Sequence, residues 1–450
     1  LTVTHYLELN GEIDLDGESQ LIQITNSDLV VGASGKLYRD QQGTADTYTY
    51  NYWSSPVGIT DQETNEYSYK LPEVLKEGTS NINFITSGYN GTDDPLGLAD
   101  YWIWKFANQT DDDYSSWQHV RSTGDVFAGE GFTMKGPGSG LITDNQNYVF
   151  SGKPNNGDID LTISSGNDYL VGNPYASSID ANKFILDNGS VINGTGATTG
   201  TLYFWEHWGG GNHNLKDYEG GYATYNLSGG TVAVAKGTPD IDVAQIGVGT
   251  KTPGRYIPIG QGFFVVAEGA GGTINFNNSQ RVFHKESSGN SIFMGPNMDT
   301  EDETPNRSNN LNTTISADIN QSTDPRLKIK IGLNSISYYH RQLLVTVDEN
   351  ATINKDWGYD ANIYDLQLDD MFWTLDNEKF VIQGIDAINQ STILPLGIQT
   401  STEGNNKISI ESLENVPYEL EVFIHDKVLD IYHDLKASNY EVYLLAGEYL

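Results

Sequence analysis

The stretch Tyr50-Asn51-Tyr52-Trp53-Ser54-Ser55-Pro56 opens a pattern that occurs twice in this chain. It is followed, in order, by Tyr101-Trp102-Ile103-Trp104 and Gly129-Glu130-Gly131-Phe132-Thr133-Met134. The second copy reads Tyr169-Leu170-Val171-Gly172-Asn173-Pro174, then Leu202-Tyr203-Phe204-Trp205, then Gly260-Gln261-Gly262-Phe263-Phe264-Val265. Because the shared landmarks are aromatic residues and turn formers, the pattern predicts a duplicated scaffold rather than a single catalytic centre.

Length and composition extend this prediction to the whole chain. The 450 residues are enough for about three domains of roughly 100 to 200 residues each. The chain has 48 Gly, 27 Tyr and 8 Trp, a composition that favours short strands and tight turns over helices. We therefore predict an all-β fold of tandem β-sandwich-like domains, two of which form an internal duplication.

Five segments follow from the periodicity of apolar residues and from the two copies. They are a β-strand region with a β-solenoid cap as one alternative (1–47), copy one (48–152), copy two (153–285), an acidic linker or long loop (286–324), and a C-terminal β-sandwich (325–450). In the first segment, the turn doublets Asn10-Gly11 and Asp16-Gly17 suit either tight hairpins or the last coils of a β-solenoid. In copy two, Ser178-Ile179-Asp180 before Ala181 and Phe184 predicts a helix N-cap and one short helix.

The charge balance limits the classes of partner and cofactor. With 60 acidic and 25 basic side chains the formal net charge is -35, which would repel nucleic-acid phosphates. Clustered carboxylates are oxygen ligands of the kind that calcium takes, so calcium is the cofactor that we consider. The chain has no Cys, which excludes disulfides, thiolate zinc sites and thiol nucleophiles. It has no run of about 18 apolar residues that would span a membrane.

One segment of copy two concentrates side chains that can do chemistry. The candidate ligand-binding residues are Glu206, His207, Trp208, His213, Asp217 and Glu219. Carboxylates, imidazoles and an aromatic side chain at this density suit a metal site or an acid/base pair beside a sugar ring. A structural loop is the alternative, because the six-residue spacing of the two His across a triple Gly matches no established metal motif.

Two further groups of residues invite a functional interpretation. Trp102, Trp104, Trp205 and Trp208 could stack on sugar rings, but Trp104 and Trp205 recur in both copies, as framework residues would. The acidic runs Asp93-Asp94 and Asp111-Asp112-Asp113 are candidate calcium ligands, and solvated turns are the alternative. No Gly-x-Ser-x-Gly elbow is present, and we identify no catalytic residue.

Several segments resemble a recurrent module of large secreted proteins of flavobacteria and related Bacteroidota. These are proteins exported through the type IX secretion system, and they include gliding-motility adhesins. The segments that carry the resemblance include Asp40-Gln41-Gln42-Gly43, Gly172-Asn173-Pro174-Tyr175, Leu202 to Gly210, Gly220 to Tyr225, Ile424-His425-Asp426 and Tyr432-His433-Asp434-Leu435. The resemblance implies an extracellular or outer-surface location and secretion or surface-assembly proteins as partners, and it supplies no catalytic residues. Such a module lies late in a long polypeptide, so we expect this chain to be part of a larger protein.

The leading hypothesis is therefore a non-enzymatic structural or adhesive module that presents upstream domains for surface attachment or gliding. A carbohydrate-binding module or an accessory domain of a glycan hydrolase is the second hypothesis, because of the aromatic and acidic residues of copy two. A passenger of the secretion machinery, whose main partner is another protein, is the third.

Overall fold

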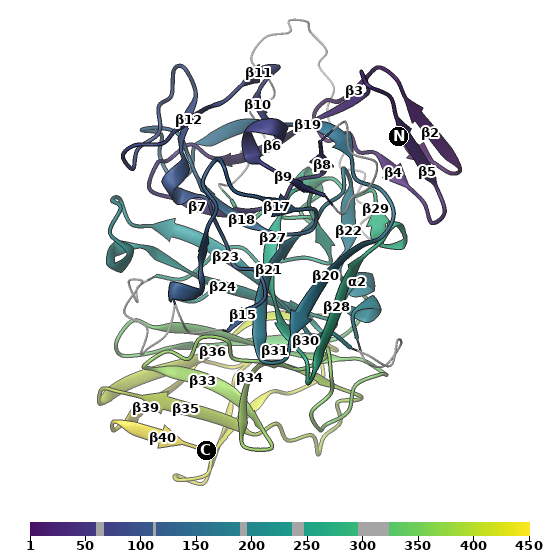
Figure 1. Ribbon diagram of the computed structural model, residues 1–450. Coiled ribbons are helices and arrows are strands. Elements are labelled where there is room, and N and C mark those ends of the chain that lie inside the picture. The colour runs from purple at the N-terminus through teal and green to yellow at the C-terminus, as the bar shows by residue number, and fades with distance from the viewer. Residues whose placement is uncertain (60–66, 111–113, 190–195, 236–246, 296–323) are drawn as a thin grey trace, which may run out of the picture.

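The computed structural model describes residues 1–59, 67–110, 114–189, 196–235, 247–295 and 324–450 (Figure 1). Within these ranges the secondary structure is almost entirely β, with two short α-helices, so the predicted all-β class is confirmed. The N-terminus lies at one end of the molecule and the C-terminus at the other, as Figure 1 shows. No helix in the described part of the chain has the length and apolar character needed to cross a bilayer.

The first strands form a coil of parallel pairs. The pairs are β1 (Thr2–Val3) with β4 (Ile22–Gln23), β2 (Tyr6–Leu9) with β5 (Asp28–Val31), and β3 (Glu12–Leu15) with β6 (Lys36–Thr44). Adjacent strands joined by tight turns would pair antiparallel, so the parallel pairs are those of a solenoid coil and not of hairpins. The long β6 then pairs antiparallel with β19 (Asn145–Pro154), which joins the coil directly to the first copy.

The two copies use the same strand register. In the first copy, β7 (Tyr50–Trp53) pairs with β18 (Phe132–Lys135), and Trp53 lies opposite Phe132. In the second copy, β21 (Asn167–Gly172) pairs with β27 (Gly262–Ala267), and Val171 lies opposite Phe263. Aligning Pro56 with Pro174 places Trp53 on Val171, and aligning Gly131 with Gly262 places Phe132 on Phe263. The two strand pairs are therefore equivalent. The duplication in sequence is therefore also a duplication of strand pairing.

The copies also join each other by reciprocal contacts. Trp53 of the first copy forms a β-bridge with Gln261 of the second copy. In the same way, Val171 of the second copy forms a β-bridge with Glu130 of the first copy. Trp53 and Val171 are equivalent positions, and so are Gln261 and Glu130. This is the isologous arrangement of a twofold dimer, here within one chain. In addition, β15 (Gln109–Thr110) of the first copy forms the edge of the second-copy sheet beside β21. The two copies thus make one body.

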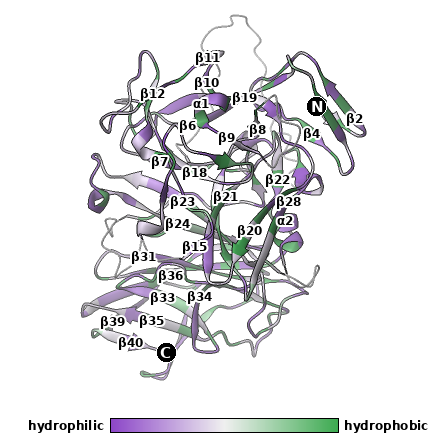
Figure 2. Cartoon of the chain, in the orientation of Figure 1, coloured by the Kyte–Doolittle hydropathy of each residue, from purple (hydrophilic) through white to green (hydrophobic). Residues whose placement is uncertain are grey.

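Each copy has its own apolar core, and aromatic residues fill the junction between them. The first core includes Trp53, Phe132 and Phe150, and the second includes Phe184, Phe263 and Phe276. The junction cluster contains Tyr52, Phe106, Leu170, Tyr203, Trp205, Tyr218 and Phe264. Burying one aromatic side chain removes roughly 150–250 Å² from water, which stabilises the fold by ~4–6 kcal/mol before entropy is counted. β20 (Ile159–Ser164) and β28 (Gly271–Phe276) pair beside the second core, and hydrophobic colour in Figure 2 alternates with paler or polar positions on them.

The predicted short helix is confirmed as α2 (Ala181–Asp187). Asp180 is its N-cap, and the side chain of Asp180 accepts a hydrogen bond from the Asn182 backbone N–H at 3.0 Å. Ala181, Phe184 and Ile185 are buried against the second core. The cap and the apolar spacing thus both act as expected.

The C-terminal strands form one large sheet with a nearly closed path. Its order is β39 (Tyr440–Leu444), β36 (Gly404–Glu414), β30 (Lys328–Asn334), β31 (His340–Val347), β34 (Glu378–Ile385), β33 (Asp370–Leu375), β35 (Leu396–Thr400) and β40 (Gly447–Tyr449). The two edge strands, β39 and β40, are separated in sequence only by Leu445 and Ala446. The sheet must therefore curl until its edges approach each other. Most of the predicted linker, residues 296–323, lies outside the described residues.

Direct hydrogen bonds fasten this sheet to the second copy. The Trp357 indole N–H donates to the Thr198 carbonyl at 2.9 Å, and the Tyr364 hydroxyl donates to the Asp168 carboxylate at 2.8 Å. The backbone N–H of Leu227 also donates to the Gly358 carbonyl at 2.8 Å. The C-terminal sheet is therefore tied to the duplicated body by main-chain and side-chain bonds.

Candidate functional site

The segment singled out in copy two forms a β-hairpin. β23 (Thr198–Gly209) pairs with β24 (Glu219–Asn226), and the register shifts between His207 and Gly209. Gly220 is required here because a Cβ atom on it would lie 2.4 Å from the Trp205 ring. Trp205 is only 2 % exposed, which agrees with its predicted framework role.

Glu206 is buried and holds a neighbouring loop in place. Its carboxylate accepts hydrogen bonds from the Thr250 N–H at 3.0 Å, the Thr250 hydroxyl at 3.2 Å and the Lys251 N–H at 3.2 Å. These three donors account for its burial in structural terms, because a buried carboxylate needs such partners.

His207 is buried and both of its ring nitrogens are engaged. Nδ1 accepts from the Tyr50 backbone N–H at 3.4 Å, and Nε2 lies 2.8 Å from the Gly209 carbonyl, to which it must donate. Burial, with the nearby Lys135 as a second cause, lowers the pKa of His207 to about 3. The imidazole is therefore neutral at physiological pH and serves as a link between the two copies.

The other two carboxylates of the hairpin, those of Asp217 and Glu219, have different surroundings from that of Glu206. Asp217 accepts from the side-chain amides of Asn212 at 2.9 Å and Asn214 at 3.1 Å, in the exposed turn. Glu219 is half-buried opposite Gly209. Glu206 and Asp217 thus belong to separate hydrogen-bonded groups. Trp208 is half-buried and packs against the second core.

His213 takes part in a different cluster, which we call the lysine cluster: Lys135, Trp102, Tyr218 and His213. The Lys135 Nζ atom lies 3.5 Å from the centre of the Trp102 ring and 4.5 Å from that of Tyr218. It also lies 3.2 Å from His213 Nδ1 and is hydrogen-bonded to the Tyr218 hydroxyl. The His213 ring in turn stacks on Trp102 at 4.9 Å.

The environment of Lys135 is unusual for a lysine. The residue is 4 % exposed, and no carboxylate of the described residues forms an ion pair with it. Desolvation lowers the pKa of Lys135 to about 6, and the charge of Asp46 opposes this only in part. In a large fraction of the molecules, Lys135 is therefore an uncharged amine at neutral pH.

Sequence reasoning missed Lys135, although a signal was present. The residue ends β18, and the duplication places it in register with Val266 of β27. A lysine at a core position where the other copy has valine is a local inconsistency, and such inconsistencies concentrate at functional or strained sites.

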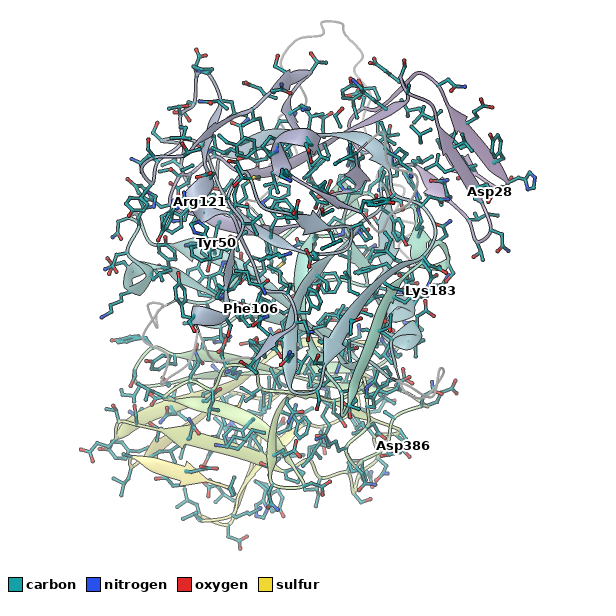
Figure 3. The ribbon with its side chains drawn as sticks, in the orientation of Figure 1. Asp28, Tyr50, Phe106, Arg121, Lys183 and Asp386 are labelled. Atoms are coloured by element: carbon teal, nitrogen blue, oxygen red, sulfur yellow. The ribbon has the colours of Figure 1, made fainter. Side chains whose placement is uncertain are left out.

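An aromatic surface extends outward from the lysine cluster. Rings contact one another in series, with Tyr89 to Tyr101 at 4.8 Å, Tyr101 to Trp102 at 4.9 Å, and Trp104 to His119 at 3.9 Å. Tyr89 is 53 % exposed, His119 is exposed, and the other rings are half-buried. Arg121, labelled in Figure 3, adjoins this surface, and its guanidinium carbon lies 5.7 Å from the centre of the Tyr101 ring. Trp104 was predicted to be a framework residue. Its backbone pairs in β14 (Trp104–Lys105), and its half-buried ring stacks on the exposed His119 at the surface.

The candidate calcium ligands are placed only in part. The Ser139 N–H and hydroxyl each lie 3.4 Å from the Asp93 carboxylate, which is thus tied to the neighbouring Gly-rich turn. Asp94 is exposed, while Asp111, Asp112 and Asp113 lie outside the described residues. In the part of the chain that the structure describes, no three His, Asp or Glu side chains gather as metal ligands would. Calcium binding stays a prediction, and melting with and without a chelator tests it, because an ion bound only to the folded chain raises Tm.

Comparison with known protein families gives a match over most of the chain. Residues 94–449 match the model of a family described as a domain of unknown function, DUF8693. This range begins inside the first copy and includes the second copy and the whole C-terminal sheet. No curated protein and no solved structure matches the chain.

Proposed function

The chain belongs to the DUF8693 family, a domain of unknown function, and from its own geometry we propose that it is a non-enzymatic structural module of a secreted or cell-surface protein. One observation carries the proposal. The coil packs along the side of both copies, where Gln20 bonds to Ser178 and Arg281 bonds to the Leu21 carbonyl, and the C-terminal sheet lies at the far end of the duplicated body (Figure 1). A body whose parts are bonded to one another in this way is suited to holding adhesive domains in a fixed position relative to the surface that anchors them.

The junctions support a mechanical role. The coil continues into the first copy through β6, the copies bridge reciprocally, and Trp357 and Tyr364 bond the last sheet to the second copy. Because each junction contains hydrogen bonds between distant parts of the chain, the parts resist independent rotation. The formal net charge of -35 also favours solubility outside the cell.

The bonding of the candidate acid and base groups favours structure over catalysis. Glu206 holds the loop at Thr250, and His207 links Tyr50 to Gly209. A glycosidase needs two carboxyl groups facing each other across a substrate, about 5 to 9.5 Å apart. Glu206 and Asp217, in separate hydrogen-bonded groups, do not favour this hypothesis.

We take the export route and the partners from the resemblance to type IX secretion substrates. In this proposal the protein acts at the outer cell surface, with secretion or surface-assembly proteins as partners and with attachment or gliding as the process it serves. The test is deletion of residues 94–449 from the full-length protein, followed by measurement of surface display and cell attachment. We expect display or attachment to fall. If both are unchanged, the proposal is wrong. If the region copurifies with the secretion machinery while attachment is unchanged, the passenger hypothesis gains.

A carbohydrate-binding role is the second candidate, and the aromatic surface favours it. Tyr89, Tyr101 and Trp102 offer adjoining ring faces, and partly exposed rings of this kind can stack on sugars. Glycan-array binding by the whole chain tests this role, with Trp102→Ala as the loss variant. Tyr338→Ala is the matched control, because that ring is 96 % exposed on the C-terminal sheet. Absence of binding by the unaltered chain would exclude this role.

A further inference from the structure

The lysine cluster contains an amine that the scaffold does not need. Val266 holds the equivalent position in the second copy, so the duplicated strand pairing forms with an aliphatic side chain there. A buried amine without a carboxylate partner is costly, and Lys135 has none among the described residues. The cost is explained if the amine has a chemical task.

The neighbours of Lys135 are suited to the chemistry of an uncharged amine. Trp102 and Tyr218 surround Nζ with ring faces, and the Tyr218 hydroxyl is within hydrogen-bonding reach. Burial raises the pKa of Tyr218 well above its ordinary value, so its hydroxyl is protonated at physiological pH. Burial also lowers the pKa of His213 to about 4, so this imidazole is a neutral acceptor at physiological pH.

His213, a direct neighbour of Nζ, is itself partly exposed. His213 is half-buried, and its Nε2 atom lies 2.5 Å from the side-chain oxygen of exposed Asn90. It sits in the turn after Gly209, which contains Gly210 and Gly211 and connects β23 to β24. In the proposal that follows, movement of this imidazole gives a small molecule access to Nζ.

We propose that Lys135 is a nucleophilic amine that captures small aldehydes by reversible imine formation. Its lone pair attacks the carbonyl carbon, the carbonyl oxygen takes up a proton, and Nζ loses one, which gives a carbinolamine. The carbinolamine then loses its hydroxyl as water: the Tyr218 hydroxyl donates a proton to the leaving oxygen, a C=N bond forms between the aldehyde carbon and Nζ, and Nζ gives its second proton back to the Tyr218 oxygen. Hydrolysis reverses the step, so no oxidant or reductant is needed. The rings of Trp102 and Tyr89 would receive the carbon skeleton, including that of an open-chain sugar.

The test is reductive trapping on the whole chain. Glycolaldehyde is added with cyanoborohydride, which reduces the imine to a stable secondary amine, and peptide mass spectrometry measures the rate at each lysine. Lys70 is the internal control, because its side chain is 43 % exposed and Asp125 raises its pKa. At pH 7 we expect Lys135 to be labelled at least tenfold faster than Lys70.

The pH profile and three variants complete the test. The titratable groups acting on Lys135 are Tyr218, His213, His207 and Asp46. The rate at Lys135 should level off not far above pH 6, whereas the rate at Lys70 should keep rising to pH 10. Tyr218→Phe should slow trapping severalfold, His213→Ala should speed it, and Lys135→Met should remove it while the chain stays folded. Labelling of Lys135 no faster than Lys70 would overturn the proposal. The proposal would also be overturned if Lys135 in the unaltered chain is not labelled and the Lys135→Met variant melts at a lower temperature. Those two results together would assign the amine a structural role.

Discussion

Glu130 and Gln261 hold equivalent positions in the two copies, and each bridges its own copy to the other. Their side chains, however, have different partners. Glu130 accepts from Lys105 at 2.8 Å, from the Tyr169 hydroxyl at 2.8 Å and from the Phe127 N–H at 2.9 Å. Gln261 accepts from the Met294 N–H at 2.7 Å. The twofold pattern of the backbone has therefore been kept while the side chains have diverged.

Replacing Glu130 should weaken the fold substantially. The variant Glu130→Ala leaves Lys105, the Tyr169 hydroxyl and the Phe127 N–H without their acceptor in a buried place, which should cost about 3 kcal/mol. Urea unfolding measures the loss. The control is Asp125→Ala, which breaks the exposed pair with Lys70 and should cost less than about 1 kcal/mol. Equal losses in the two variants would contradict a buried structural role for Glu130.

The junction also depends on a glycine that can adopt positive φ. Gly129 has φ +83, and a Cβ atom on it would lie 3.2 to 3.3 Å from Ile159, Leu161 and Phe276. Gly157 has a similar φ of +78 but nothing within 4 Å, so it is a matched control. Gly157→Ala should cost about 1 kcal/mol from backbone strain alone. Gly129→Ala should cost clearly more by urea unfolding, and equal costs would show that the contacts at Gly129 relax freely.

Local sequence signals predicted the local features of this fold. Asp180 and the apolar residues after it predicted α2, and the periodicity of apolar residues in 325–450 predicted the β-strands of the last sheet. The repeated landmarks predicted the duplication. In each case the information lies within a few neighbouring residues, where propensity and periodicity act.

The pairing between distant segments was not predictable in this way. Alternating residues with Asn10-Gly11 suit a hairpin as well as a solenoid coil, because both need a strand followed by a turn. The lysine cluster joins residues 102, 135, 213 and 218, and no periodicity relates them. Aligning the two copies position by position would have pointed to the lysine cluster, because Lys135 aligns with Val266.

The attachment of the C-terminal sheet should depend on Trp357. Its ring packs on Gly189 and Gly200, and its indole N–H bonds to Thr198. Because the ring is half-buried, Trp357→Ala should cost about 2–3 kcal/mol, below the usual range for a fully buried tryptophan. In calorimetry we expect residues 324–450 to unfold separately at a lower temperature. Tyr338→Ala removes a ring that is 96 % exposed and should change stability by less than about 0.5 kcal/mol. A single unchanged transition in Trp357→Ala would show that the other bonds suffice.

His207 should make the fold sensitive to acid. Burial lowers its pKa to about 3 in the folded chain, whereas an unfolded chain has a histidine pKa of about 6.5. As the pH falls below 6.5, the unfolded state takes up the proton first, so stability decreases until the pH reaches about 3. The contribution of His207 is thus complete above pH 6.5 and is lost across this window, by on the order of a few kcal/mol.

The variant His207→Gln tests the predicted direction of this change in stability with pH, because glutamine is polar but does not titrate. It should be less stable than the unaltered chain at pH 7, since Tyr50 and Gly209 lose well-placed partners. Urea unfolding at pH 7 and pH 4 should nevertheless show a smaller acid loss in the variant, by a few kcal/mol. His5→Gln, which removes an exposed imidazole near the N-terminus, is the matched control. If His207→Gln loses as much stability between pH 7 and pH 4 as the unaltered chain does, His207 is not the buried neutral group that its two hydrogen bonds require.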